Sequence, residues 1–427
     1  MKHLFHPSHA FPFQASLLAC LVASSLPSFA AGNEGGSINL ATALSRAVEK
    51  NPSLAAYDAE IRSAEARILS ALARPNPELI TEVEDVLGSG NFEGFDGAIY
   101  NLGIEQLIET GHKRKLRGEV SDARSERARL EFEVAKRELL VEVGQRFVDV
   151  LAAQEIEARA SENLKIARDA AVAVQKQVEA GRGSGIDAGQ AKIGENEARL
   201  SFESARLQTE LKRQRLSALW GAETPDFSHA SGSLSAPAGP TPELSALTAN
   251  VGQHPSIALA EAGVSIAQRE LSLEEKNRLP DVTVGVGYRR DEAVDDNAMV
   301  LGFSLPLPLF DRNEGGIAEA EANIGKSEAI KRSAETQLRL RISSARAEME
   351  AARMAYQLVA GDMMRTATDH FEKLSEGFAM GRTRYLELLE ARRSLLSVRK
   401  QRVEALEDYH RARVTVEALT TNPDLSK

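Results

Sequence analysis

Residues 282–289 read Val-Thr-Val-Gly-Val-Gly-Tyr-Arg, so apolar side chains alternate with small or polar ones. The same period of two recurs at 298–305 and 100–105, and more weakly at 79–84. Alternating segments of ~10 residues are typical of a transmembrane β-barrel, with apolar side chains toward lipid and polar ones toward the lumen. A soluble sheet with one wet face produces the same alternation. The strand pattern alone leaves both structures open.

The proline positions predict two long helical tracts. No proline occurs in residues 78–224 or 309–422, and proline breaks helix interiors. Apolar residues at steps of three and four across 116–150 mark an amphipathic or coiled-coil seam. One helix over 114–180 would be ~100 Å long. The glycine-rich turn at 181–185 then sends the chain back, which predicts a long helical hairpin in each half.

The two halves of the chain carry matching motifs. Residues 51–54 (Asn-Pro-Ser-Leu) match 254–257 (His-Pro-Ser-Ile). A displacement of about 200 residues is too long for a solenoid repeat and indicates a duplication. A stretch rich in proline and glycine reads as the linker between the halves. The predicted organisation is a first repeat at 31–224, a linker at 225–242, a second repeat at 243–420 and a tail at 421–427.

Residues 1–30 have the layout of a secretory signal peptide. A basic residue precedes the apolar run 15–23, and small residues stand at both recognition positions of Ser28-Phe29-Ala30. Cleavage there would remove Cys20, the only cysteine, although 17–20 loosely resembles a lipoprotein cleavage box. No later stretch reaches the ~18 apolar residues of a membrane-spanning helix. We expect an exported protein without a transmembrane helix.

Composition excludes several classes of function. The chain has 52 basic and 62 acidic residues and is 5% aromatic. The acidic balance argues against nucleic-acid binding, and so few aromatic residues favour thin helices over a large compact core. No nucleophile elbow, acid–base pair or Cys/His cluster is found. We therefore predict no enzyme, no cofactor and no metal site.

The number of strands predicts an oligomer. Four strands cannot close a lipid-exposed barrel, and open sheet edges are not tolerated in hydrocarbon. Single-chain barrels begin at eight strands. If the strands cross a membrane, a dimer would supply eight of them and a trimer 12.

The segments that flank the strands are distinctive. They are Asn76-Pro77-Glu78-Leu79, the ten residues 105–114 (Glu-Gln-Leu-Ile-Glu-Thr-Gly-His-Lys-Arg), and 306–313 (Pro-Leu-Pro-Leu-Phe-Asp-Arg-Asn). On these residues the chain resembles the TolC-type outer-membrane factors, and within them the outer-membrane components of cobalt–zinc–cadmium efflux systems. The resemblance covers about 38–419. That subgroup usually has a second glycine where His112 stands.

The resemblance implies a fold that is mainly α with a small β part. Long antiparallel helical hairpins would form an α-barrel, and four strands per chain would contribute to a trimeric 12-stranded transmembrane β-barrel. The implied function is a passive duct through the outer membrane into the periplasm. The implied partners are a periplasmic adaptor and an inner-membrane proton-driven pump, besides the other copies of the homotrimer and outer-membrane lipid.

Two groups of charged residues are candidates for function. The strand alternation places Glu82, Glu84 and Glu105 toward the lumen, where carboxylates would favour cations. Side chains in a barrel lumen are hydrated, however, so a charge is also tolerated there without any role in ion selectivity. The other group lies at the two hairpin turns and comprises Gly181, Arg182 and Asp187, with Gly381, Arg382 and Glu387 in the second half.

The hairpin turns have a structural and a functional interpretation. Glycine permits the positive φ that ends a helix, and an acid near the start of the returning helix suits its dipole. By resemblance, the turns would also gather at the mouth of the tunnel, where the adaptor docks and the closed tunnel must dilate.

Three hypotheses for the whole chain remain open. The first is a trimeric outer-membrane duct for metal cations, and the second is the same duct exporting drugs, solvents or proteins. The third is a soluble periplasmic coiled-coil scaffold or adaptor.

Overall fold

The computed structural model describes residues 36–181 and 183–420. The predicted signal peptide at 1–30 with Cys20, the tail at 421–427 and Arg182 therefore lie outside the described residues. The chain divides into two compact units. The hairpin unit comprises Met1–Ala55, Val134–His254 and Thr336–Lys427, and the strand unit comprises Ala56–Glu133 and Pro255–Glu335.

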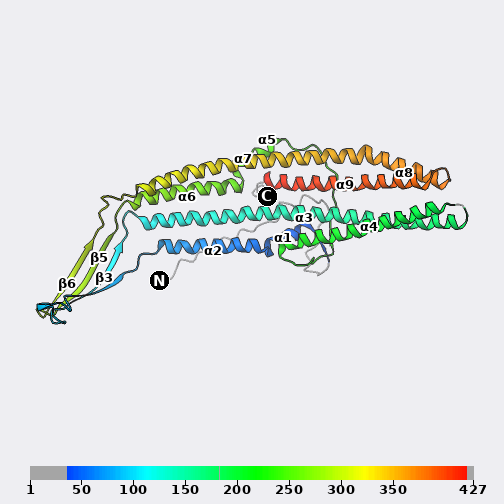
Figure 1. Ribbon diagram of the computed structural model, residues 1–427. Coiled ribbons are helices and arrows are strands. Elements are labelled where there is room, and N and C mark those ends of the chain that lie inside the picture. The colour runs from blue at the N-terminus through cyan, green and yellow to red at the C-terminus, as the bar shows by residue number, and fades with distance from the viewer. Residues whose placement is uncertain (1–35, 182, 421–427) are drawn as a thin grey trace. The chain divides into compact units, whose positions relative to one another are not determined.

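The strand unit contains the four-stranded sheet that the alternation predicts (Figure 1). All neighbouring strands are antiparallel, in the order β2-β3-β5-β6, so β2 and β6 lie at the two edges. The pairing of β3 with β5 joins the two halves of the chain in one sheet. The bounds are β2 Glu78–Glu84, β3 Ile99–Ile108, β5 Val282–Asp291 and β6 Asp296–Ser304.

Long helices precede and follow each pair of strands. Helix α2 (Pro52–Leu72) precedes β2, and α6 (Pro255–Asn277) precedes β5. Helix α3 (Lys113–Glu179) follows β3, and α7 (Glu314–Leu358) follows β6. Helix α3 runs for 67 residues without interruption, as the proline-free tract predicts. The two halves thus share one order of elements.

Hydrogen bonds fasten the strand–helix connections within the strand unit. The Thr110 backbone N–H donates to Asp281 Oδ1 over 2.8 Å, and Lys113 Nζ lies 2.9 Å from the same oxygen. In the second half, Asn313 Nδ2 donates to Glu274 Oε2 over 2.6 Å and to the Glu274 carbonyl over 2.9 Å. Polar side chains therefore fix the strand–helix connections of both halves.

The hairpin unit contains the two predicted helical hairpins. The first pairs the end of α3 with α4 (Gly185–Ser217), and the second pairs α8 (Met364–Ala379) with α9 (Tyr385–Thr420). The second proline-free tract contains a π-helical turn at Val359–Met363 between α7 and α8. Such a turn changes the spacing of side chains locally, which hydrophobic periodicity alone did not predict.

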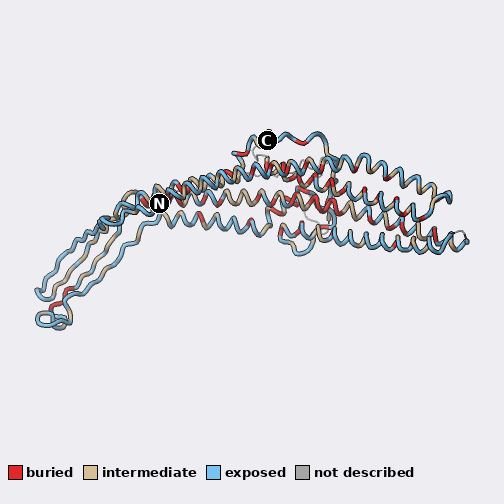
Figure 2. Tube along the Cα trace, turned by 45° about the horizontal axis from the view of Figure 1, so that its top comes forward, coloured by how far each residue is buried: buried red, intermediate tan, exposed pale blue. Residues whose placement is uncertain are grey.

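Buried side chains form narrow seams along the helices (red in Figure 2). Near the hairpin turns, Val174, Ala191, Tyr385 and Leu389 form a small cluster, in which the rings of Tyr385 and Phe378 lie 5.7 Å apart. Alanine and short aliphatic residues make up most of the buried set. Thin helices packed in this way explain why so few aromatic residues suffice.

Short elements complete the described residues, with Gly90–Phe92 in the strand unit and the others in the hairpin unit. Strand β1 (Ser37–Ile38) pairs in parallel with β4 (His229–Ala230), so the predicted linker at 225–242 is docked along its course. The remaining elements are α1 Leu40–Lys50, α5 Leu244–Thr248 and three 3₁₀ turns at Gly90–Phe92, Ala218–Trp220 and Val251–Gln253. Across the described part of the chain, no helix has the length and apolar character needed to cross a membrane.

The turn before α3 explains why the resembling subgroup usually has a glycine where His112 stands. Gly111 and His112 have φ angles of 64° and 63°, a left-handed conformation that costs a side chain about 1 kcal/mol or more. We predict that His112→Gly raises the free energy of unfolding by about 1 kcal/mol, measured by thermal unfolding in detergent. The matched control is Lys115→Gly in the exposed first turns of α3, which should lower it by about 1 kcal/mol. A loss of stability in both variants would contradict this interpretation.

Candidate functional site: two sheet faces and the hairpin turns

One face of the sheet is apolar and exposed. Directly opposed residues of antiparallel strands point to the same face, and the register aligns Leu102 with Tyr288 and Tyr288 with Met299. An exposed apolar patch of this extent marks a surface that contacts a partner or a membrane. Its large residues are Leu79, Val83, Tyr100, Leu102, Ile104, Ile108, Val284, Val286, Tyr288, Met299, Leu301 and Phe303, all exposed.

The opposite face carries the predicted acids. Glu82 pairs with Asn101, Glu84 with Ile99 and Glu105 with Gly285, so the three carboxylates share a face. This face is otherwise lined largely by glycine and small residues, as the alternation predicts. A Cβ added at Gly285 would lie 3.1 Å from Glu105 Cγ, so glycine leaves space for that side chain.

Sequence reasoning missed four charges on this polar face. Glu78 lies opposite Glu105, and Arg289 lies opposite Asn101. Near the other end of the strands, Asp291 lies opposite Ile99 and Asp296. Glu78 stands at the end of the weakest strand pattern, where the alternation could have been extended by one residue. Arg289 partly offsets the negative charge, so the face is acidic on balance but not uniformly.

The first hairpin turn has the geometry that its residue types predict. Gly181 has a φ of 73° and its N–H donates to the Val178 carbonyl over 2.9 Å. Ser184 Oγ accepts from the Ile186 N–H over 3.1 Å and caps α4. Asp187 lies in the first turn of α4, where the helix dipole favours negative charge.

The second hairpin turn repeats this arrangement. Gly381 has a φ of 71°, and the Arg382 N–H donates to the Gly377 carbonyl over 2.8 Å. Glu387 lies in the first turn of α9, 3.7 Å from the exposed Arg384. Sequence reasoning did not single out Arg384. Both turns therefore present charged side chains beside a left-handed glycine.

Arginines of α9 tie the two hairpins together within the hairpin unit. Arg392 donates to the carbonyl and to Oδ1 of Asn163 on α3, both over 2.5 Å. Arg393 lies 2.7 Å from Glu197 on α4. Burial lowers the pKa of Arg392 from its usual value, and the two Asn163 oxygens satisfy its donors. No sequence signal marks these residues, because their partners are distant in the chain.

The histidines do not form a metal site in the described part of the chain, where no group of three or more His, Cys, Asp or Glu side chains is arranged to hold an ion. Burial, with Arg137 and Arg341, lowers the pKa of His254 to about 4. Burial also lowers the pKa of His410, whose Nε2 lies 2.9 Å from the Ser235 carbonyl oxygen. Both rings serve as neutral packing groups.

A family model for outer membrane efflux proteins matches residues 43–222 and 249–422. The chain belongs to the outer membrane efflux protein family. It is 31% identical over 385 residues to the cobalt-zinc-cadmium resistance protein CzcC of Cupriavidus metallidurans, covering 90% of each chain. It is 28% identical over 278 residues to the nickel and cobalt resistance protein CnrC of the same organism, covering 65% of each. Among solved structures, the channel-forming CusC superposes with a TM-score of 0.73 at 17% identity, covering 99% of each chain.

Family membership confirms several predictions. The resemblance to TolC-type factors and to their heavy-metal subgroup is confirmed, as are the outer-membrane location and the mainly α fold with a small β part. An efflux role in the outer membrane decides against the third hypothesis, the soluble periplasmic scaffold or adaptor. Within an outer-membrane efflux protein, the exposed apolar face of the sheet is the surface suited to lipid.

Two neighbouring residues of β6 test which face contacts lipid. Leu301, which is 83% exposed, lies on the apolar face, and Val300 lies on the polar face. We predict that Leu301→Arg costs ~2 to 4 kcal/mol per copy near the bilayer midplane and abolishes membrane assembly. Val300→Arg, which adds the same side chain one residue away, should assemble normally. The measurement is the yield of heat-modifiable oligomer in the outer-membrane fraction, and equal yields from the two variants would refute the assigned facing.

Proposed function

We propose that this efflux protein is the outer-membrane duct of a tripartite exporter of divalent heavy-metal cations. The observation that carries the proposal is the similarity over 90% of both chains to a cobalt-zinc-cadmium resistance protein. The nickel and cobalt resistance relative points in the same direction. The duct has no reaction to catalyse, so its chemistry is limited to shape and charge along the path.

The unpaired edges of the sheet require further copies of the chain, and by resemblance to the family we propose a homotrimer. Strand β6 of one copy would pair with β2 of the next, and three copies would close 12 strands. Helix α4 supports lateral packing of copies, because Ile186, Ile193, Leu200 and Leu207 recur at every seventh position and are exposed. A seven-residue apolar repeat is the pattern of a helix that packs along another helix.

The acidic face would line the lumen of that barrel. With the apolar face toward lipid, Glu82, Glu84 and Glu105 of each copy would point into the pore, together with Glu78. Clustered carboxylates raise the local concentration of cations. Conduction also requires that an ion leaves readily, which suits carboxylates that line a wide, wet pore.

The experiment that tests the cargo is a resistance screen. A strain lacking this gene should tolerate several-fold less cobalt, zinc, cadmium or nickel and accumulate more of the ion, and expression of the wild-type chain should restore both. The non-assembling Leu301→Arg variant should fail to restore resistance, and Val300→Arg should succeed. Unchanged metal tolerance together with a new sensitivity to drugs or solvents would contradict the metal cargo and favour the drug-exporting duct.

The hairpin turns are proposed to meet the periplasmic adaptor. Six turns of a trimer would present Asp187 and Glu387 near Gly181 and Gly381, with Glu387 exposed and Asp187 half-buried. Charges of opposite sign on the adaptor would then align it with the duct. The proton-driven pump would dock through that adaptor.

Reversing both acids tests this docking role. We predict that Asp187→Arg with Glu387→Arg leaves oligomer yield and outer-membrane location normal, because helix-end charges at exposed positions contribute about 1 kcal/mol or less. The double variant should nevertheless lose metal resistance and adaptor crosslinking, or leak antibiotics. Glu348→Arg, on an exposed face of α7, serves as the control. Normal export and normal crosslinking would show that the two acids only begin helices.

A further inference from the structure

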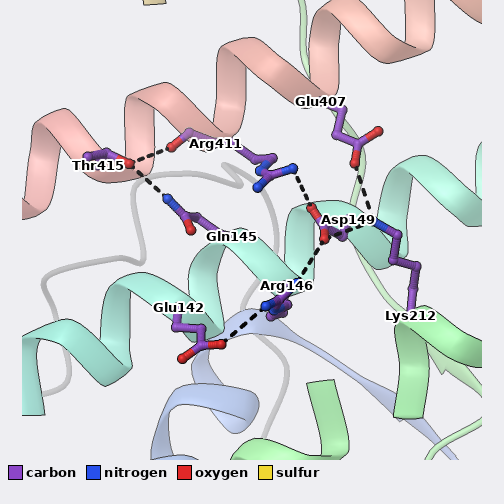
Figure 3. Close-up of polar contacts among 8 residues, drawn as sticks. All are labelled: Glu142, Gln145, Arg146, Asp149, Lys212, Glu407, Arg411 and Thr415. Carbon is purple, nitrogen blue, oxygen red and sulfur yellow. Dashed lines mark hydrogen bonds and ion pairs between the residues drawn. The ribbon is translucent and has the colours of Figure 1, made fainter. Parts of the chain in front are cut away.

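A carboxylate is buried where α3, α4 and α9 meet in the hairpin unit. The Asp149 side chain is 2% exposed, and cations from all three helices converge on it (Figure 3). Lys212 Nζ lies 3.0 Å from Oδ2, Arg146 lies 3.8 Å from the same oxygen, and Arg411 lies 3.6 Å from Oδ1. Asp149 Oδ1 nevertheless accepts no hydrogen bond within the described chain.

A second carboxylate shares one of these cations. Glu407 on α9 lies 3.8 Å from Lys212 Nζ, and its side chain is 18% exposed. The pKa of Glu407 is raised to about 7, chiefly by burial and then by the nearby Asp149, with a smaller contribution from Asp408. Lys212 and Arg411 act in the opposite direction. Glu407 therefore changes charge near neutral pH, whereas an ordinary glutamate is ionised.

We propose that Glu407 and Asp149, bridged by Lys212, form a proton-binding site that controls how tightly α9 is held against α3 and α4. When Glu407 is protonated, Lys212 pairs with Asp149 alone. When Glu407 is ionised, Lys212 is shared between two carboxylates, and the new charge requires water beside Asp149, whose side chain is only 2% exposed. Neighbouring contacts, such as the 2.9 Å hydrogen bond from Gln145 to Thr415, then separate more readily.

The sign of the pH dependence follows from the raised pKa. The folded junction binds a proton that a solvated glutamate would release above its ordinary value of about 4.5. This stabilisation is fully present below that value and is lost as the pH rises through about 7. The junction is therefore tightest in acid and loosens above neutrality.

The consequence for transport rests on the proposed duct. Helix α9 is one arm of the second hairpin, and α3 and α4 are the arms of the first. A tunnel wall made of such helices can dilate only if neighbouring hairpins shift. The site would make that shift easier at higher external pH, because the periplasm equilibrates with the medium.

A distance measurement between α3 and α9 tests the site without reference to any cargo. Spin labels are placed at the exposed Ala158 and Ser394 in a Cys20→Ser background, and the labelled chain is diluted with unlabelled chain so that each oligomer carries one labelled copy. In purified wild-type protein, the distance distribution should broaden or lengthen as the pH rises, with a midpoint near 7. Because transport is not measured, failure of the metal screen and failure of this test are distinguishable.

Three variants decide the outcome. Glu407→Gln should abolish the pH response, so that the distance distribution seen in acid persists at every pH. Glu404→Gln, on the same helix but outside the cluster, should retain the response. Asp149→Asn should move the midpoint to lower pH, because it removes the negative charge that raises the pKa of Glu407. A merely structural role for the pair would not move a midpoint. A wild-type distance independent of pH, or an unchanged response in Glu407→Gln, would overturn the proposal.

Discussion

Backbone hydrogen bonding at the sheet edges is the constraint on which the structure depends. Hydrocarbon contains no water to satisfy an unpaired N–H or C=O group, so an open edge within a membrane is not tolerated. This chain ends its sheet at β2 and β6 after only four strands. A single copy is therefore incomplete as a membrane protein, and the edges demand other strands whatever cargo the duct carries.

The shared order of elements in the two halves provides a simple way to meet that demand. Each half contributes two strands, and the β3–β5 pairing joins the halves although α3, α4 and α6 lie between these strands in sequence. The register then puts one continuous apolar face on all four strands, because a shift of one residue would exchange the faces. Polar contacts such as Lys113 with Asp281 hold the turns where strand geometry changes to helix geometry. Apolar residues can thus recur with one spacing in the strands and with another in the helices of a single chain.

Local patterns predict much of this fold from sequence. The period of two located the strands, the proline-free tracts located the long helices, and Gly181 and Gly381 located turns that require positive φ. Such patterns do not predict contacts between helices that are distant in sequence. Asn163 and Arg392, or Asp149 and Glu407, look like ordinary solvated residues until the hairpins bring them together. The π-helical turn at Val359–Met363 also escaped prediction, because no proline marks it in the sequence.

The effect of a charged side chain in this protein depends on whether water reaches it. Glu82 on the sheet and Glu387 at a hairpin turn are exposed, so their charges act through long-range attraction and are screened by salt. Asp149 is buried, and its charge must be balanced by Lys212 and Arg411 at short range. Exposed charges therefore suit a path that ions must leave quickly. A buried set responds to a single proton, because each added or removed charge must be compensated within the same small volume.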